Sequence, residues 1–324
     1  LGLKEQAKNK SKKIFVFIDE IQNYPPITKV IKYLIDHYSV KFIVTGSSNF
    51  YLKNFFPESL SGRKFIFHLA PLDFKEYLYF KNKLDIKAAM NNKLPAKLNS
   101  IDLFSFKKRE KDYDDYLLFG GFPEVILTEK KETKKMILKN IFASFFEKDL
   151  NVLTDYKDIR EVRDLILLLV PRVGSMIDVS KIAGELGIDR PKVYSYLEFL
   201  QGTFFIRLLP KYSKSIDRSV AGGRKVYFTD TGILNIIGKV NEPQLFENAV
   251  VNQCTQYGDI SFYHKNKKEV DLVLNKESIF EIKMSGTDTD YAKLRKIASH
   301  LQLSYYVISK NVYNKKGFVN AVQL

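Results

Sequence analysis

The feature that most constrains the fold is the run Ile14–Ile18, five consecutive apolar residues that end in the carboxylates Asp19 and Glu20. A strand that is apolar at every position, rather than at every second one, is predicted to be buried on both faces, as in a parallel sheet flanked by helices. Ligands of such sheets lie at the carboxyl ends of the strands. The two carboxylates are therefore predicted at the ligand-binding edge of an α/β domain.

A carboxylate pair at this place suits nucleotide hydrolysis. The Asp can hold Mg²⁺, and the following Glu can polarise a water for attack on a γ-phosphate. This is the Walker B arrangement of a P-loop ATPase, and a strand end followed by a helix cap is the alternative. The sequence contains no Gly-rich loop ending in Gly-Lys-Ser/Thr, and only Leu1–Lys13 precede the strand. Because the chain begins with Leu, we expect a fragment that lacks its amino-terminal portion.

A second buried strand, Val40–Val44, follows a helix-like run over Ile27–His37 and ends in the small polar residues Thr45–Asn49. Strand, helix and strand in this order are typical of a parallel βαβ unit. Hydroxyls at the end of the second strand are placed to contact a γ-phosphate or its attacking water. A turn would select the same residue types, so both interpretations stay open.

The motifs of the chain and their order resemble those of the archaeal and bacterial AAA-type ATPases that carry a DUF4143 carboxyl-terminal region. Five segments carry the resemblance, in family order: Asp19–Gln22, Thr45–Ser48, Ser59–Arg63, Pro71–Leu78 and Gly120–Glu124.

This resemblance implies ATP and Mg²⁺ as cofactors. Asp19 would hold Mg²⁺, Glu20 would activate water, and Thr45 or, as second choice, Ser47 would take the sensor position. Arg63 resembles a family arginine that contacts phosphate in its own subunit or a neighbour's, which allows for a homo-oligomer. A surface ion pair is the alternative for Arg63.

Size and charge narrow the class of protein. A chain of 324 residues suggests two or three domains, and a net charge of +15 favours polyanionic partners, either nucleic acid or acidic membrane. Solvated lysines are the alternative. No apolar run approaches the ~20 residues that span a membrane. A single cysteine, Cys254, fits a reducing cytoplasm, and with four histidines it cannot build a usual zinc site.

The middle of the chain predicts a winged helix. Asp178 caps a short amphipathic helix, Gly187 makes a turn, and a second helix covers Asp189–Leu200, with strands at Phe204–Pro210 and Lys225–Thr229. Contacts to DNA are expected at the second helix and at the connection between the strands. The residues predicted for these contacts are Arg190, Lys192, Lys211, Lys214, Arg218 and Arg224. Docking of a protein is the alternative.

The carboxyl-terminal segment resembles the core of the PD-(D/E)XK nuclease fold. The expected elements are a helix over Leu245–Tyr257, strands over 261–265, 269–274 and 278–283, a helix over 290–301 and a strand over 304–309. The resemblance places active-site residues at Glu247, Asp271, Glu281 and Lys283.

The local sequence supports that placement. Asp271 lies inside an apolar strand, and Glu281 and Lys283 are two residues apart, hence on one face of a strand. Charges with apolar neighbours in a central strand are costly unless they are paired or metal-bound. In the nuclease interpretation Asp271 and Glu281 hold Mg²⁺ while Lys283 stabilises the attacking hydroxide. An exposed strand face with a surface Glu–Lys pair is the alternative.

The sequence therefore predicts an α/β multidomain protein of the cytoplasm. Residues 1–80 would be the later part of an AAA-type core, 81–240 a helical lid with a winged helix, and 241–324 the nuclease-like module. One function hypothesis is an ATPase that acts on DNA through the winged helix and the tail, with Mg²⁺-dependent cleavage as a further activity. The other is a regulatory or scaffold ATPase whose basic tail docks proteins.

Overall fold

The computed structural model describes residues 14–21, 24, 26–38, 40–46, 65–91, 103–149, 156–213, 222–266 and 268–324. Its contacts divide the chain into two units. One unit comprises Leu1–Leu69 with Leu197–Phe204, and the other comprises Ala70–Tyr196 with Phe205–Leu324. The predicted boundaries at residues 80 and 240 stay predictions.

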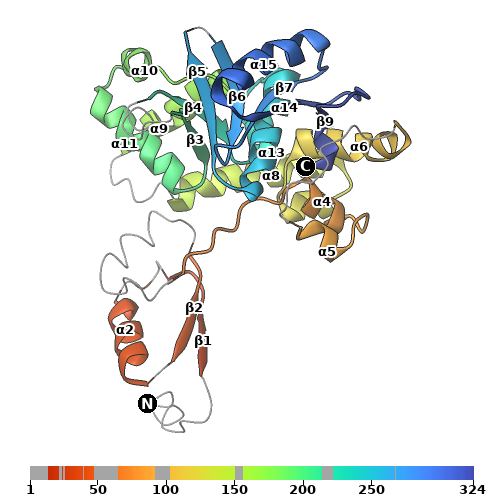
Figure 1. The fold of residues 1–324 in the computed structure, drawn as a ribbon. Helices are drawn as coiled ribbons and strands as arrows, with labels where there is room; N and C mark the ends of the chain where they lie inside the picture. Colours follow the sequence, from red (N-terminus) through yellow and green to blue (C-terminus); the bar gives the residue numbers. More distant parts are fainter. Residues whose placement is uncertain are drawn as a thin grey trace. The chain divides into compact units, whose positions relative to one another are not determined.

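The smaller unit contains the predicted βαβ arrangement. Strand β1 (Phe15–Ile18) pairs with β2 (Lys41–Val44) in parallel register, and α2 (Ile27–Tyr38) connects them (Figure 1). The helix packs its apolar stripe on one face of the strand pair, where Ile21 and Ile31 are buried. The predicted order of strand, helix and strand is confirmed.

The prediction that both faces of the first strand are buried is wrong for the described residues. Phe15 is 52% exposed, Phe17 72% and Ile43 50%, whereas Val16 and Ile18 on the opposite face are half-buried. The cause is that α2 covers one face of the strand pair, and no other described element of this unit covers the second. A strand of consecutive apolar residues thus has two apolar faces, but the sequence does not show that other elements pack against both of them.

The larger unit begins with helices. In chain order they are α4 (Phe74–Phe80), α5 (Ile86–Ala89), α6 (Leu103–Phe119), α7 (Pro123–Leu127), α8 (Lys131–Ser144) with a π-helical extension over Phe145–Asp149, and α9 (Tyr156–Leu169). A turn at Gly120–Gly121 separates α6 from α7, and Gly120 has a φ of +74°. Glycine adopts this left-handed conformation without the clash that a Cβ would cause.

A helix pair and a hairpin follow. Helix α10 (Val179–Leu186) ends at Gly187, whose φ of +66° closes the helix, and α11 (Arg190–Gly202) comes next. Asp178 caps α10 as predicted, because its side chain accepts a hydrogen bond from the Lys181 amide at 3.0 Å. Strands β3 (Ile206–Pro210) and β4 (Arg224–Phe228) pair antiparallel. Chain segments at Val173 and Met176 form single bridges to β4 on its other edge.

The last part of the chain is a mixed sheet with helices. The elements are α13 (Thr231–Ile237), α14 (Glu242–Cys254), β5 (Ile260–Lys265), β6 (Lys268–Leu274), β7 (Ser278–Lys283), α15 (Asp288–Leu301), β8 (Ser304–Ser309) and β9 (Phe318–Asn320).

The strand order in this sheet is β5-β6-β7-β8-β9, antiparallel between β5, β6 and β7 and parallel between β7, β8 and β9 (Figure 1). The three predicted strands before α15 and the one after it are confirmed, whereas β9 was not predicted. Ile279 and Phe280 point to opposite faces of β7 and both are fully buried, so the sheet is covered on both sides. Helices α14 and α15 both contact β7.

Candidate carboxylate and lysine site

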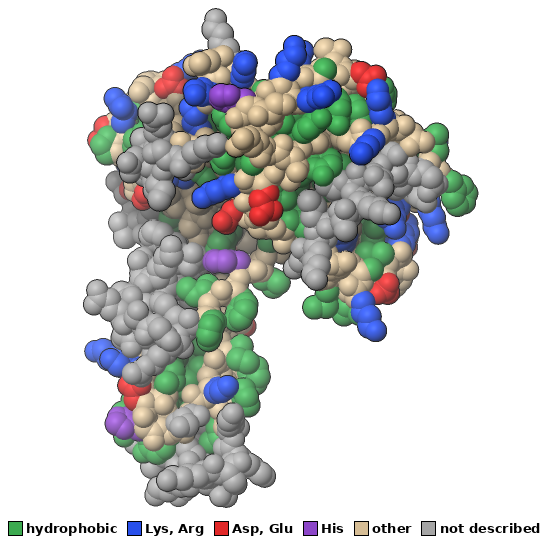
Figure 2. Space-filling view, viewed as in Figure 1, with side chains coloured by type: hydrophobic (Ala, Val, Ile, Leu, Met, Phe, Trp, Pro, Cys, Tyr) green, Lys and Arg blue, Asp and Glu red, His purple; other side chains and the backbone are tan. Residues whose placement is uncertain are grey.

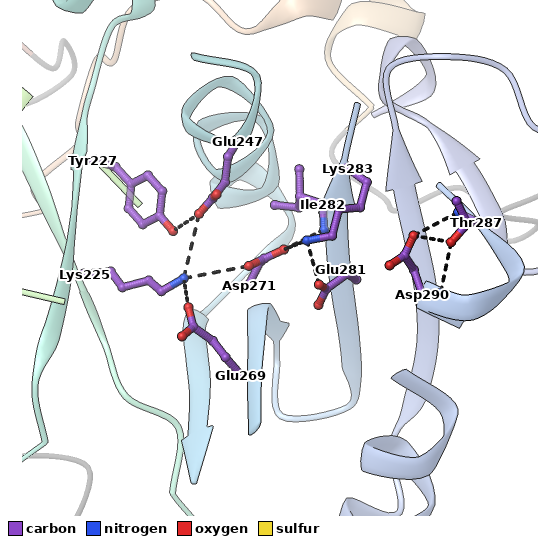
Figure 3. Close-up of polar contacts among 10 residues, drawn as sticks. All are labelled: Lys225, Tyr227, Glu247, Glu269, Asp271, Glu281, Ile282, Lys283, Thr287 and Asp290. Atoms are coloured by element: carbon purple, nitrogen blue, oxygen red, sulfur yellow. Dashed lines mark hydrogen bonds and ion pairs between the residues drawn. The ribbon is translucent and has the colours of Figure 1, made fainter. Parts of the chain in front are cut away.

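The four residues predicted for the carboxyl-terminal site lie together in the structure. Glu247 comes from α14, Asp271 from β6, and Glu281 and Lys283 from β7 (Figure 3). The Lys283 ammonium nitrogen lies 2.8 Å from Glu281 Oε1 and 3.9 Å from Asp271 Oδ2. The two-residue spacing of Glu281 and Lys283 puts both side chains on one face of β7, as expected.

The strand register explains why Asp271 joins them. Leu272 pairs with Phe280 in the antiparallel register of β6 and β7, which brings the preceding residue Asp271 beside the β7 segment that carries Glu281. The backbone N–H of Ile282 donates to Asp271 Oδ2 at 2.8 Å, so the carboxylate is fixed to the neighbouring strand. Its buried position is therefore compensated by a charge-assisted hydrogen bond.

Strand β4 contributes two residues that sequence reasoning missed. The Lys225 ammonium nitrogen lies 2.6 Å from Glu269 Oε1 and 3.8 Å from both Glu247 Oε1 and Asp271 Oδ1. The Tyr227 hydroxyl donates to Glu247 Oε1 at 2.7 Å. Figure 3 shows Lys225 reaching between Glu247, Glu269 and Asp271. The Lys225 side chain is only 2% exposed, so the cluster is built around a buried ammonium.

Burial and mutual repulsion raise the pKa of two carboxyls in this cluster. The pKa of Glu247 is about 7, because burial and the Asp271 charge outweigh the opposing effects of Lys225 and the Tyr227 hydroxyl. The pKa of Glu281 is also about 7, from burial and Asp271 against the effect of Lys283. Burial would lower the pKa of Lys225, yet Glu247, Asp271 and Glu269 together hold it above its ordinary value. Lys225 is therefore charged at neutral pH.

The cluster does not fit a divalent metal ion. Within the described ranges, no group of three or more His, Cys, Asp or Glu side chains is arranged to hold one. Asp271 and Glu281, predicted as Mg²⁺ ligands, are instead contacted by the ammonium groups of Lys225 and Lys283. Each carboxylate thus has a cationic partner from the chain itself, and Mg²⁺ ligation by this pair stays a prediction that these contacts oppose.

The predicted ATPase residues lie at the ends of β1 and β2 in the smaller unit. The Thr45 hydroxyl donates to Asp19 Oδ1, and the Glu20 N–H donates to Thr45 Oγ1 at 3.1 Å. Glu20 has a φ of +52°, a left-handed conformation that is uncommon for a residue with a side chain. The exposed Asp19 fits the way proteins hold Mg²⁺ through one or two carboxylates plus substrate phosphates. Ser47 and Arg63 lie outside the described residues.

The residues predicted to contact DNA differ in their surroundings. Arg190 at the start of α11 and Arg224 on β4 are exposed, and Lys211 forms a backbone bridge to Phe262. Lys192 lies 2.7 Å from Asp158 Oδ1 and 2.6 Å from Glu161 Oε2.

Two carboxylates of α9 therefore already hold the Lys192 ammonium, which opposes its assignment to a phosphate. Lys214 and Arg218 lie outside the described residues. Figure 2 shows Lys and Arg side chains of the larger unit spread out on this face rather than gathered in one patch. Across the described helices, none has the length and apolar character needed to cross a membrane.

Two family matches cover different parts of the chain. Residues 2–78 match the AAA domain, and residues 110–244 match a domain of unknown function, DUF8612. The second match is to a different domain from DUF4143, so that part of the resemblance stays a prediction.

Similar proteins from three organisms are uncharacterised. One from Methanocaldococcus jannaschii is 29% identical over 324 residues, covering 94% of this chain and 69% of the relative. One from Haemophilus influenzae is 26% identical over 304 residues, covering 89% of this chain and 71% of the relative. One from Mycobacterium tuberculosis is 22% identical over 312 residues, covering 90% of this chain and 64% of the relative. No solved structure is significantly similar to the chain. Residues 2–78 are thus similar to an AAA domain, and the chain as a whole has relatives in archaea and bacteria.

Proposed function

We propose that this chain is part of an ATPase in which Asp19 would position the Mg²⁺ that accompanies the nucleotide and Glu20 would activate the attacking water. The observation that carries the proposal is the contact of Thr45 with both residues at the carboxyl ends of two parallel strands. The Thr45 hydroxyl, the Asp19 carboxylate and the Glu20 backbone N–H then meet at the edge where parallel sheets bind ligands. The AAA domain match over residues 2–78 supports the same assignment.

The test measures phosphate release from ATP by the longest product of the gene that contains this chain. Glu20→Gln removes the group that activates water, so we expect hydrolysis to fall by roughly 100-fold or more while ATP binding is retained. Asp19→Asn should weaken the Mg²⁺-dependent part of ATP binding. Asp36→Asn, an exposed carboxylate on α2, is the matched control and should leave both unchanged. An undiminished rate in Glu20→Gln would overturn the proposal.

A second part of the proposal is action on DNA through the helix pair α10–α11, the hairpin β3–β4 and the nuclease-like tail. The exposed arginines Arg190 and Arg224 and the net charge of +15 support it. Helix, three strands, helix and strand, with Glu247, Asp271, Glu281 and Lys283 close together, support a nuclease-like origin for the tail. Ancestry of a fold does not establish its activity, and the alternative is a tail that docks proteins.

Anisotropy of a labelled DNA duplex, measured across a salt series, separates the two. If the arginines contact phosphates, Arg190→Ala and Arg224→Ala should each weaken binding and reduce the salt slope by about 1. Binding with no salt dependence would refute the DNA assignment and leave protein docking. Cleavage of the duplex with Mg²⁺, abolished in Asp271→Ala and in Lys283→Ala, would show that the tail also cuts.

A further inference from the structure

The ammonium of Lys225 lies where the carboxylates of the cluster converge. Among the residues that the structure describes, two lysines form ion pairs with four acidic side chains, namely Glu247, Glu269, Asp271 and Glu281. Lys283 is 39% exposed and contacts the edge of the group at Glu281 and Asp271. Lys225 is 2% exposed and reaches three of the four carboxylates. The two lysines are therefore not equivalent, and Lys225 supplies the buried positive charge.

We propose that Lys225 is a resident cation of this cluster, in the role that a divalent metal ion has in nuclease-like sites, and that its removal exposes a divalent-cation site at Glu247 and Asp271. The inference rests on the geometry of these side chains and holds whether or not the chain contacts DNA.

The surroundings of Lys225 fix it in this role. Its ammonium also lies over the ring of Phe262 on β5, 5.6 Å from the centroid, where a cation is attracted to the face of the ring. The next residue on the same face of β4, Tyr227, donates its hydroxyl to Glu247. Strand β4 thus brings both a cation and a hydrogen-bond donor to the carboxylates of α14 and β6.

The same carboxylate oxygens cannot serve Lys225 and a metal ion equally well. Glu247 Oε1 and Asp271 Oδ1 each lie 3.8 Å from the ammonium, so a divalent ion bound to these oxygens would lie close to it, and the two cations would repel each other. Without Lys225 the carboxylates of Glu247, Glu269 and Asp271 would lose their shared cation, and uncompensated buried charges are strongly destabilising. A divalent cation of Mg²⁺ or Mn²⁺ type, with its preference for oxygen ligands, is the class of ligand that would relieve this.

The experiment compares Mn²⁺ binding by the wild-type chain, Lys225→Met and Lys225→Arg, using isothermal titration and thermal unfolding. Met is an unbranched side chain that fills the buried path without charge, and Arg retains the cation. We expect no Asp271-dependent Mn²⁺ uptake by wild type or Lys225→Arg. Lys225→Met should bind one Mn²⁺ per chain, with an unfolding midpoint raised by about 3 °C or more at 100-fold excess over Kd.

Two controls make the result specific. Lys315→Met removes an exposed lysine that pairs with Asp288 at 2.7 Å, and it should gain no Mn²⁺ site. Adding Asp271→Asn to Lys225→Met should abolish the gained site. Mn²⁺ uptake by the wild type that is lost in Asp271→Asn would overturn the proposal, and so would a folded Lys225→Met that binds no Mn²⁺. If Lys225→Met does not fold alone, recovery of its circular dichroism by Mn²⁺ supports the proposal and failure to recover overturns it.

Discussion

The buried carboxylate of Asp230 should be among the most important polar groups for the stability of the larger unit. It is 4% exposed, and its two oxygens accept separate hydrogen bonds. Oδ2 accepts from the Gly121 N–H at 2.8 Å, and Oδ1 accepts from the Ile233 N–H at 2.8 Å, which caps α13. A Cβ at Gly120 would lie 2.2 Å from Oδ2, so glycine at that position leaves the room that the carboxylate occupies.

The expected cost of Asp230→Ala follows from these two bonds. A hydrogen bond to a charged group contributes about 1.5–3 kcal/mol, and the alanine variant leaves the buried Gly121 N–H without an acceptor. Part of this is offset because burial already disfavours the charge, which raises the pKa of Asp230 to about 6. We therefore expect Asp230→Ala to lower the free energy of unfolding by about 4 kcal/mol.

Asp178→Ala is the matched control for this substitution. Asp178 also caps a helix, but through one bond at an exposed site, and its loss should cost about 1 kcal/mol. Because the chain contains no tryptophan, the assay is urea unfolding followed by circular dichroism. A loss in Asp230→Ala no larger than that in Asp178→Ala would refute the view that the paired bonds to Gly121 and Ile233 join α13 to the α6–α7 turn.

Three further predictions concern the carboxylate cluster. Stability should fall as pH rises from about 5 to about 8, because Glu247 and Glu281, with pKa values of about 7 against an ordinary 4.5, bind protons that the unfolded chain has released. The loss is on the order of 3 kcal/mol for each group, and Glu247→Gln should flatten the pH dependence of the urea midpoint. Gly174→Ala should destabilise the protein more than Gly187→Ala, as measured by the thermal unfolding midpoints. Both glycines have a positive φ, but a Cβ at Gly174 would lie 2.8 Å from Glu247 Oε1, whereas one at Gly187 would meet nothing within 4 Å. Tyr227→Phe removes a hydrogen bond that lowers the pKa of Glu247, so the pH midpoint of stability should move upward.

Much of the carboxyl-terminal site was predictable because its signals are local. Asp271 lies in an apolar strand, and Glu281 and Lys283 lie on one face of a strand because they are two residues apart. A charged side chain in such a strand needs a compensating partner, so the sequence alone predicts a site here. The cap at Asp178 and the turn at Gly187 are likewise read from neighbouring residues. These predictions needed no knowledge of how distant segments pack.

The partners of these residues were not predictable in the same way. Gly223 and Arg224 precede Lys225, and Val226 follows it. This local sequence is typical of the exposed start of a strand, so it does not predict that Lys225 is buried. Its burial depends on β4 meeting α14 and β6, a contact that no local pattern encodes. The exposed Phe15 and Phe17 show the converse, since their apolarity says nothing about whether another element covers them.

The arrangement around Lys225 makes the members of the cluster depend on one another. Removing the lysine leaves three carboxylates without their shared cation, whereas removing Glu247 leaves the Tyr227 hydroxyl without its acceptor and weakens the field that keeps Lys225 charged. Effects of such contacting residues do not add, so a double-mutant cycle of Lys225→Met and Glu247→Gln should show a coupling energy of about 1–3 kcal/mol. The double variant should lose less stability than the sum of the two single variants. Each single substitution leaves the other group without its partner, whereas the double variant removes both groups together. Additive losses would mean that the 3.8 Å contact between these two side chains carries no energy and that Glu269 and Asp271 hold the ammonium without Glu247.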